Sequence, residues 1–382
     1  MSKNKKKIIF LTGTRADFGK LKSLISITKK SKLFDINIFV TGMHLDKKFG
    51  YTIDEIKKSG FKSIFSLKNN TNTSKMELIL ANTVKGFSKY IHSNNPDLIV
   101  VHGDRIEALA GAIVGSLNNI LVGHIEGGEL SGTIDELIRH AITKMSHLHF
   151  VSNKEAFLRL IQLGELKKSI HIIGSPDLDL MNPKKLQSEK KVKSYYGIKY
   201  DNYAIAMYHP VTTEVRDIKK QIKIFIESLK RSNKKYILIY PNNDTGSDII
   251  IDEYKTLKKN KNFKIFRSLR FEYFLTLLYN CDFIVGNSSA GIKEAPYYNI
   301  PSINIGSRQQ NRSNQKSINH CECKAIQIQK CINKIEKIEY SKKSINFSTF
   351  GSGNSDKLFL KIIKNKIFWK TNKQKQFQDK NI

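Results

Sequence analysis

Residues 120–135 read ILVGHIEGGELSGTID, and this stretch joins a short apolar strand pattern to a helix pattern through a glycine-rich loop. The helix pattern begins with Thr133 as a candidate N-cap, followed three residues later by Glu136, which is the spacing of a capping box. Apolar side chains then recur along one helical face, at Ile134, Leu137, Ile138, Ala141, Ile142 and Met145. A strand that leads through a loop into an amphipathic helix is the repeating unit of an α/β fold.

The same alternation of short apolar runs and helix patterns extends along nearly the whole chain. In the first half we expect strands at residues 8–12, 36–41, 98–101, 120–123, 149–151 and 170–173. In the second half we expect them at residues 203–207, 236–240, 263–266, 283–285 and 302–305. Short buried strands that alternate with helices predict parallel sheets.

Two domains are expected, because 382 residues can form two full hydrophobic cores. The stretch 175–200, with two prolines and several lysines, separates the two sets of strands. We therefore predict Rossmann-like α/β/α domains at residues 1–178 and 179–353. Residues 354–382 form a helix, with Ser355 as a possible cap, and a basic tail that returns to the N-terminal domain. Two such domains would face a central cleft at the carboxyl ends of their strands.

The net charge of +31, from 65 Lys and Arg against 34 Asp and Glu, raises the hypothesis of nucleic-acid binding. The lysines, however, are scattered over helix faces and concentrate at the two chain ends, and no zinc-finger spacing or RNA-binding motif accompanies them. We expect no nucleic-acid partner, although a basic protein attracts anionic substrates.

The thiols and the N-terminus indicate a cytoplasmic protein without a membrane segment. The cysteines, Cys281, Cys321, Cys323 and Cys331, are too few for a disulfide scaffold, and only His320 lies near the Cys-x-Cys pair as a further metal ligand, so we expect free thiols and no metal. A lysine cluster precedes the apolar residues 8–11, but this run is too short for a signal peptide. The apolar stretch 108–117 is too short to span a bilayer.

Three carboxylates, Glu126, Glu129 and Asp135, lie within ten residues on the loop that follows the strand at 120–123. Carboxylates in this position are suited to acid/base chemistry, and the glycines beside them would let the backbone approach a ligand closely. Asp135 also has a purely structural explanation, since the helix dipole stabilises an aspartate in a first turn.

The first strand-to-helix turn, residues 13–21, fits neither common nucleotide motif. It has two glycines where a dinucleotide fingerprint needs three, and five residues where a P-loop has four, with Leu21 in place of a hydroxyl residue. The turn therefore predicts no NAD or ATP site. It delivers Arg15 either to a phosphate or carboxylate, or to solvent. After a later strand, Asp104 and Arg105 form either a structural ion pair or part of the same site, and their strand-end position favours the site.

The second domain carries further polar turns after its strands. Pro210 should hold the chain extended so that His209 points outward, and Asn242 lies on a loop of turn-forming residues. At residues 285–295 a strand turns through Ser288 and Ser289 into an expected helix N-terminus, which would bind a pyrophosphate. One turn into that helix, Glu294 could accept hydrogen bonds from ribose hydroxyls, and the turn after the next strand adds Arg308 near the phosphates.

These motifs together resemble the hydrolysing UDP-N-acetylglucosamine 2-epimerases of bacterial sialic acid synthesis. The resemblance covers residues 7–312 in order and at matching spacing. It rests on TGTRAD (12–17), HGDR (102–105), HIEGGELSGTID (124–135), YHPVTT (208–213), PNND (241–244) and GNSSAG (286–291).

The resemblance implies a GT-B-like pair of Rossmann-like domains and a reaction that needs neither NAD nor a metal. UDP-N-acetylglucosamine would lose its C2 proton and its UDP by elimination across C1–C2, and the resulting 2-acetamidoglucal would be hydrated to N-acetylmannosamine. Elimination requires a base at C2 and stabilisation of the departing pyrophosphate, and hydration requires both an acid and a base. We also expect a homo-oligomer, either a dimer or a tetramer.

Carried onto matching positions, the resemblance assigns proton transfers to Asp104, Glu126 and Asp135 in an order that stays open. His209 would stabilise the leaving phosphate or transfer a proton to it. Glu129 ranks last among the carboxylates, as a brace for the loop. The positions expected to bind the nucleotide are Arg15, Arg105, Ser288, Ser289, Glu294 and Arg308, with Asn242 and Arg270 lining the cleft.

Several alternatives remain open. A GT-B glycosyltransferase would share the fold but needs no group of carboxylates on this loop. A nucleic-acid-binding protein would explain the charge but none of the motifs. Within the epimerases, a non-hydrolysing enzyme or a hydrolysing one that acts on a UDP- or GDP-linked diacetylbacillosamine is the nearest alternative.

Overall fold

The computed structural model describes residues 5–70, 73, 75–131, 133–310, 312–313, 315–337, 350–376 and 378. The chain divides into two compact units, each with its own parallel sheet. The first unit comprises residues 1–129, 135–180 and 349–382, and the second comprises residues 130–134 and 181–348. The expected α/β class with two parallel-sheet domains is confirmed.

The sheet of the first unit has seven parallel strands in the order β3-β2-β1-β4-β5-β6-β7. They are β1 (Lys6–Thr12), β2 (Phe34–Val40), β3 (Ile64–Ser66), β4 (Leu98–His102), β5 (Leu121–Ile125), β6 (Leu148–Val151) and β7 (Ile170–Ile172). Six of them correspond to the expected strands. The sequence analysis missed β3, which is short, lies at the edge of the sheet and is only partly buried.

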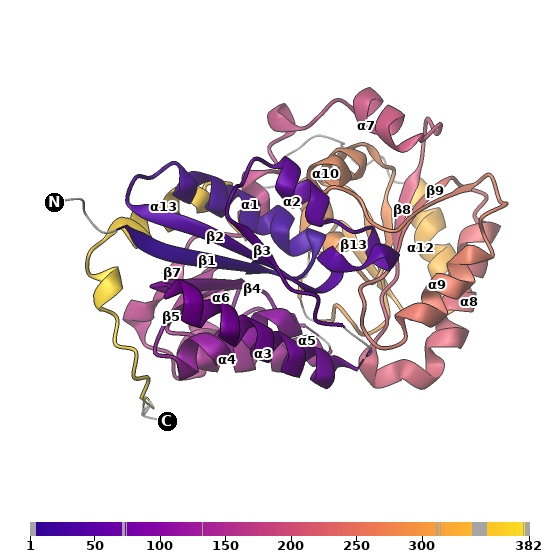
Figure 1. Ribbon diagram of the computed structural model, residues 1–382. Coiled ribbons are helices and arrows are strands. Elements are labelled where there is room, and N and C mark those ends of the chain that lie inside the picture. Colours follow the sequence, from indigo (N-terminus) through magenta and orange to yellow (C-terminus); the bar gives the residue numbers. More distant parts are fainter. Residues whose placement is uncertain are drawn as a thin grey trace. The chain divides into compact units, whose positions relative to one another are not determined.

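Helices cover both faces of this sheet (Figure 1). The elements are α1 (Arg15–Lys29), α2 (Ile53–Lys58), α3 (Met76–Asn94), α4 (Ile106–Leu117), α5 (Ile134–Met145), α6 (Lys154–Gln162) and α13 (Ser355–Lys364), with 3₁₀ turns at Gly42–Leu45, Lys47–Phe49, Lys167–Ser169, η4 (Pro176–Asp179) and Phe368–Lys370. In Figure 1, α3, α4 and α5 lie on one face, while α1 and α13 lie on the other.

Two details of these helices correct the sequence analysis. Leu137, expected on the apolar face of α5, is 67 % exposed, and the buried face instead carries Asp135 and Arg139. Asn354, rather than Ser355, occupies the cap position of α13, and the Ser355 N–H donates to Asp179 Oδ1 at 2.7 Å. In both helices, polar residues occupy positions that apolar periodicity alone did not predict for them.

The sheet of the second unit has six parallel strands in the order β10-β9-β8-β11-β12-β13. They are β8 (Ala204–Met207), β9 (Tyr236–Ile239), β10 (Phe263–Phe266), β11 (Ile284–Gly286), β12 (Ser302–Ile305) and β13 (Ile318–Cys321). The helices are α7 (Glu189–Tyr196), α8 (Ile218–Arg231), α9 (Ser247–Lys255), α10 (Phe271–Asn280), α11 (Glu294–Tyr297) and α12 (Ala325–Lys337), with 3₁₀ turns at Pro183–Lys185, Thr212–Asp217 and η7 (Ser289–Gly291). The sequence analysis missed β13, another edge strand.

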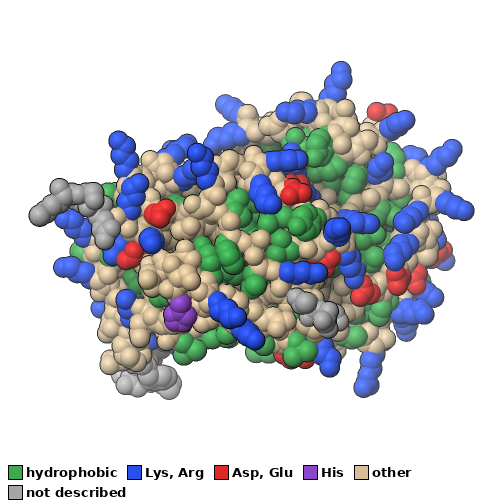
Figure 2. Space-filling view, viewed as in Figure 1, with side chains coloured by type: hydrophobic (Ala, Val, Ile, Leu, Met, Phe, Trp, Pro, Cys, Tyr) green, Lys and Arg blue, Asp and Glu red, His purple; other side chains and the backbone are tan. Residues whose placement is uncertain are grey.

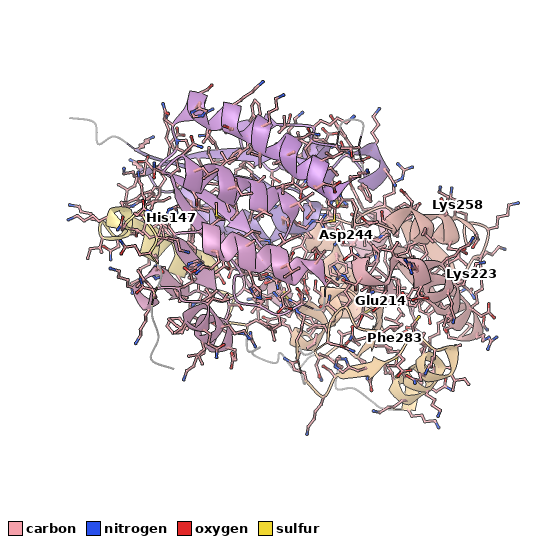
Figure 3. The ribbon with its side chains drawn as sticks, turned by 90° about the horizontal axis from the view of Figure 1, so that it is seen from below. His147, Glu214, Lys223, Asp244, Lys258 and Phe283 are labelled. Carbon is pink, nitrogen blue, oxygen red and sulfur yellow. The ribbon has the colours of Figure 1, made fainter. Side chains whose placement is uncertain are left out.

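Each unit has a separate hydrophobic core. In the first unit, Phe359 of α13 is fully buried, and its ring packs 4.8 Å from that of Phe150 on β6, so the C-terminal helix completes this core. In the second unit, Phe283 is 1 % exposed, whereas Lys223 on α8 and Lys258, which lies beyond the end of α9, are exposed (Figure 3).

The strand order reverses beside the first strand of each sheet. β1 lies between β2 and β4, and β8 lies between β9 and β11. In open α/β sheets, ligands bind outside the carboxyl ends of the strands at such reversal points. The turns after β1, β4 and β5 in the first unit, and after β8 and β11 in the second, are therefore the places to look for a site.

On the face shown in Figure 2, positive charge is not gathered into one band. Lys and Arg side chains are spread over this face and interspersed with apolar and polar groups. In the described part of the chain, no helix combines the length and apolar character needed to cross a bilayer.

Candidate active site

The first unit gathers charged side chains at the carboxyl ends of three neighbouring strands. Asp17 lies in the first turn of α1 after β1, His102 is the last residue of β4, and Glu126 directly follows β5. The turn η4, which follows β7, adds Asp177. The reversal point of the sheet thus positions residues from distant parts of the sequence in one cluster.

Glu126 has a strained backbone at the start of the carboxylate loop. Its φ of +61° lies in the left-handed region, which costs a residue other than glycine free energy and often marks a functional position. The Glu126 N–H still donates to Phe150 O at 2.9 Å, so the residue is anchored to β6 although β5 has ended. This conformation fixes the direction in which the carboxylate leaves the sheet.

Two glycines of the loop, Gly127 and Gly128, allow close packing within the protein, and the expected close approach of a ligand stays a prediction. A Cβ on Gly128 would lie 2.4 Å from the carbonyl oxygen of Ala156 on α6, and one on Gly127 would lie 2.9 Å from His124 Nδ1. Gly132 lies outside the described residues. The described part of the loop is therefore locked against α6 and β5.

The Glu126 carboxylate is buried among cations and a hydroxyl. Ser175 donates a hydrogen bond to Oε1, while His102 Nε2 lies 3.3 Å and Lys20 Nζ 3.9 Å from Oε2. Lys20 also lies 3.3 Å from Asp177 Oδ2. These neighbours all favour the ionised carboxylate.

His102 is a residue of this cluster to which the sequence analysis gave no role. Its Nδ1 lies 3.4 Å from Asp17 Oδ1, opposite the contact of Nε2 with Glu126. Burial alone would lower the pKa of His102, but its contacts with the two carboxylates outweigh burial and raise the pKa to about 9. The sequence feature that could have identified His102 was its place at the end of an expected strand, two residues before Asp104.

Asp104 forms an ion pair with Arg139 of α5. Arg105 occupies the cap position of α4, with its Nε 4.0 Å from Glu107 Oε2. Arg139 also donates to the backbone oxygen of Glu129 at 2.9 Å, so this one guanidinium joins α5 to the carboxylate loop. Sequence periodicity could not single out Arg139.

Arg139 is the electrostatic centre that all the predicted carboxylates share. Burial lowers the pKa of Arg139, but Asp104, Glu129, Asp135 and Glu126 outweigh that effect and raise it. Of the three residues expected to transfer protons, Asp104 contacts Arg139 directly, and Glu126 and Asp135 act on it through their charges. Glu129 accepts a hydrogen bond from Ser152 at 3.0 Å, as a brace would.

Arg15 is the first residue of α1 and forms an ion pair with Glu55 of α2. The structure thus places it in the first unit with a carboxylate partner, where its expected role towards a phosphate stays a prediction.

In the second unit, His209 is buried, at 5 % exposure, so the expectation that it points outward is wrong. The side chain of Asn287 accepts from the His209 N–H at 2.6 Å and donates to its carbonyl oxygen at 2.8 Å. The Asn242 N–H donates to His209 Nδ1 at 3.1 Å. Because Nδ1 accepts, a neutral ring carries its proton on Nε2. Asn287 is a positioning residue that the sequence analysis quoted within a motif but did not assign.

The turn that we expected to bind phosphate has a different form from the one predicted. Ser288 and Ser289 lead into the single 3₁₀ turn η7, and Ser288 Oγ accepts from the Ala290 N–H at 3.3 Å. Glu294 is buried as the first residue of the four-residue helix α11, not one turn into a longer helix. Gly286 is required here, since a Cβ would lie 1.8 Å from Met207 O.

Two arginines of the second unit occupy different parts of its sheet. Arg308 follows β12 and donates to the carbonyl oxygen of Asn287 at 3.4 Å, so it belongs with the turn after β11. Arg270 follows the edge strand β10 and lies 5.0 Å from the Tyr195 ring. β9 and β8 separate β10 from β11, so Arg270 is placed apart from the serine turn.

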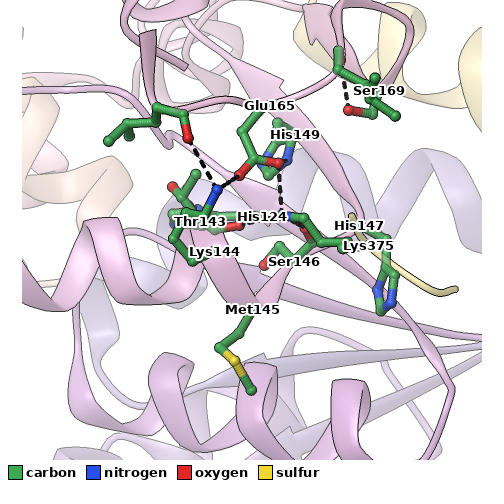
Figure 4. Close-up of polar contacts among 12 residues, drawn as sticks. His124, Thr143, Lys144, Met145, Ser146, His147, His149, Glu165, Ser169 and Lys375 are labelled. Carbon is green, nitrogen blue, oxygen red and sulfur yellow. Dashed lines mark hydrogen bonds and ion pairs between the residues drawn. The ribbon is translucent and has the colours of Figure 1, made fainter. Parts of the chain in front are cut away.

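A polar cluster around Glu165 contacts the C-terminal part of α5 (Figure 4). The buried Glu165 carboxylate accepts hydrogen bonds from His149 at 2.9 Å, from Lys144 at 3.1 Å and from Lys375 at 2.6 Å. Burial raises the pKa of Glu165, but His149 and Lys375 outweigh it and lower the pKa to about 2. Lys375 belongs to the C-terminal tail, for which the sequence analysis offered only a return to the first domain.

Lys375 also caps the helix that carries Asp135 and Arg139. Its ammonium group donates to the carbonyl oxygens of Thr143 at 3.1 Å and Ser146 at 2.7 Å, at the C-terminal end of α5. A cation in this position satisfies free carbonyl groups and interacts favourably with the helix dipole.

We expect Lys375→Met to destabilise the protein by about 1–3 kcal/mol, since buried acceptors lose their donor. Thermal unfolding should show a lower melting temperature, while Lys373→Met, an exposed change in the same tail, should not. The pKa of Glu165 falls from 4.5 to about 2 on folding, so its stabilising contribution is present above pH 4.5 and lost as the pH falls towards 2. The difference between wild type and Lys375→Met should shrink over that range, and a constant difference would contradict the assignment.

Among the residues that the structure describes, no group of three His, Cys, Asp or Glu side chains is arranged to hold a metal ion.

Comparison with known proteins gives consistent results. A family model described as UDP-N-acetylglucosamine 2-epimerase matches residues 26–364. The chain is 44 % identical over 377 residues to the UDP-N-acetylglucosamine 2-epimerase of Neisseria meningitidis serogroup B. This match covers 99 % of this chain and 100 % of the relative. The chain is 37 % identical to the hydrolysing UDP-N,N'-diacetylbacillosamine 2-epimerase of Legionella pneumophila, over 82 % of this chain and 84 % of the relative.

Among solved structures, the UDP-GlcNAc 2-epimerase of Methanocaldococcus jannaschii, in complex with UDP-GlcNAc and UDP, matches with a TM-score of 0.79. The match covers 94 % of this chain and 99 % of the other at 22 % sequence identity. At that identity the likeness shows the fold, a pair of Rossmann-like domains.

Proposed function

This chain belongs to the UDP-N-acetylglucosamine 2-epimerase family, and we propose that it catalyses the hydrolysing form of the reaction. UDP-N-acetylglucosamine and water would give N-acetylmannosamine and UDP through a 2-acetamidoglucal, for use in sialic acid biosynthesis. The substrate is supported by the name of the relative that is 44 % identical to this chain. The hydrolysing type is supported by the relative that is 37 % identical.

The observation that carries the proposal is the group of carboxylates around Arg139. Elimination needs a base for the C2 proton, and the following hydration needs an acid and a base for water. Asp104 pairs with Arg139, and the charges of Glu126 and Asp135 also act on this guanidinium, which supports the proposal that the three carboxylates serve one site. A simple nucleotide-sugar transferase has no need for such a group.

The second unit supplies the groups suited to the departing nucleotide. A neutral His209 presents Nε2–H as a donor, because Nδ1 is occupied by the Asn242 N–H. Hydrogen bonds to the leaving phosphate stabilise the charge that develops as the C1–O bond breaks. We propose that Ser288, Ser289 and Arg308 contribute to the same task and that Glu294 binds the ribose.

The experiment that tests the proposal is NMR of the purified protein with UDP-N-acetylglucosamine in heavy water and in ¹⁸O-labelled water. We expect free N-acetylmannosamine with deuterium at C2, because elimination removes the C2 proton and the following hydration adds a deuteron from the solvent at C2. The ¹⁸O label should enter the sugar and be absent from UDP, because cleavage at C1 leaves the bridging oxygen on the nucleotide.

Each alternative predicts a different product. A UDP-linked mannosamine would identify a non-hydrolysing epimerase, and turnover only after an acceptor is added would identify a transferase. The Legionella relative supports one further candidate substrate, UDP-linked N,N'-diacetylbacillosamine. A much higher kcat/KM for that sugar in a parallel assay would replace N-acetylglucosamine as the assigned substrate.

A further inference from the structure

His102 lies between two carboxylates on opposite sides of its ring. Nδ1 is 3.4 Å from Asp17 Oδ1, Nε2 is 3.3 Å from Glu126 Oε2, and the side chain is only 6 % exposed. A neutral imidazole has one N–H and would turn a lone pair towards one of the carboxylates. Only the imidazolium offers an N–H to both. Neither contact has hydrogen-bond geometry, but two carboxylates within 3.4 Å on opposite sides of a buried ring favour its protonated form.

The charges around the ring agree with this protonation state. Burial raises the pKa of Asp17, but the contact with His102 and the charge of Arg105 outweigh burial and lower the pKa. The shifts of Asp17 and His102 thus have opposite directions, as expected for an ion pair. The described titratable groups that act on His102 or its two partners include Asp17 and Lys20 of α1, His44 after β2, Arg105 and Glu107 at the start of α4, His124 of β5, Glu126 directly after β5, Arg139 of α5 and Asp177 of η4.

Asp17 is a rigid anchor for the ring. Its carboxylate accepts from the Thr14 N–H at 3.1 Å, and its own N–H donates to Thr14 Oγ1 at 3.1 Å, which together form the capping box of α1. The N-terminal end of a helix also favours a negative charge. Asp17 therefore remains ionised and fixed while it holds the ring.

We propose that His102 is a positioning residue that stays protonated between Asp17 and Glu126, and that its charge keeps Glu126 oriented and ionised, as a base rather than an acid. This inference rests on the proposed function and deepens it, because it assigns one of the three proton-transfer carboxylates a direction. The strained backbone of Glu126 and the hydrogen bond from Ser175 fix the remaining freedom of that carboxylate.

The first test is the pH dependence of kcat in His102→Gln, in which a donor remains but the charge is lost. We expect kcat to fall about 10-fold to 100-fold with little change in KM. The acidic limb of the profile should move up by about one pH unit or more, because Glu126 loses an adjacent positive charge. His92→Gln, an exposed change on α3, should leave the profile unchanged. A lower kcat with an unmoved acidic limb would mean that His102 is merely structural.

The second test is Asp17→Asn, which keeps an acceptor for the capping box but removes the anchoring charge. The pKa of His102 is raised to about 9, so wild-type activity should decline as the pH rises through about 9. In Asp17→Asn the same decline should begin at a lower pH. An unchanged basic limb would overturn the inference.

The ionisation of His102 can also be read without any turnover. With ¹³C-labelled histidine, the protein gives signals from 10 residues, and the signal missing from His102→Gln identifies His102. We expect that signal to titrate near pH 9 in the wild type and lower in Asp17→Asn. Titration near the ordinary value of 6.5 would refute the inference even if the protein is an epimerase. Absence of turnover with a high His102 pKa would instead refute the proposed function alone.

Discussion

Glu126→Gln, Asp104→Asn and Asp135→Asn should each lower turnover of UDP-N-acetylglucosamine by at least about 10²-fold, since removal of a positioned acid or base typically costs 10²–10⁴. The substituted amides keep the shape and one acceptor, so the fold should persist. UDP binding, measured by calorimetry, should survive in all three, because none of these carboxylates is assigned to nucleotide binding.

Glu129→Gln is the matched comparison, as it removes a buried carboxylate from the same loop. We expect its turnover to fall less than about tenfold, because the hydrogen bond from Ser152 indicates a bracing role. If two of the three main variants retained near-normal turnover, the carboxylate assignment would be wrong.

Arg139→Leu should destabilise the protein by about 1–3 kcal/mol, since it removes a buried donor from the carboxylate loop and the ion-pair partner of Asp104, which is itself 23 % exposed. Arg139 is 4 % exposed, pairs with Asp104 and donates to the backbone of the carboxylate loop, so its loss leaves several groups uncompensated. Urea and thermal unfolding should both report the change.

Arg231→Leu is the control for this prediction. Arg231 forms an exposed pair with Glu227 on α8, and such pairs contribute about 0.3–0.5 kcal/mol. Adding Asp104→Asn to Arg139→Leu should recover part of the lost stability, because the isolated charge disappears. A double variant as unstable as the sum of the two single changes would show that the Asp104–Arg139 pair is not the cause.

Hydrophobic patterning was sufficient to predict the two parallel sheets and most of their strands. The two strands that escaped prediction, Ile64–Ser66 and Ile318–Cys321, are both edge strands. An edge strand pairs with one neighbour only and is less fully buried, so it need not carry a continuous apolar run. Apolar spacing also predicted the wrong buried face of α5. Burial of residues on that helix depends on their charged partners, which apolar spacing does not reveal.

Local motifs were sufficient to predict that four site residues follow strands or begin a helix, because turn-forming residues mark these places in the sequence. The four residues are Asp104, Glu126, Asp135 and His209. Their partners could not be predicted in this way. Asp104 pairs with Arg139, 35 positions away, and the Asn287 side chain accepts a hydrogen bond from the backbone of His209, 78 positions away. Local motifs cannot specify such pairs, because the residues meet only when parallel strands pair side by side and their carboxyl ends come to the same edge of the sheet. The protonated His102 has the same origin, since its charge exists only where the fold buries it between two carboxylates.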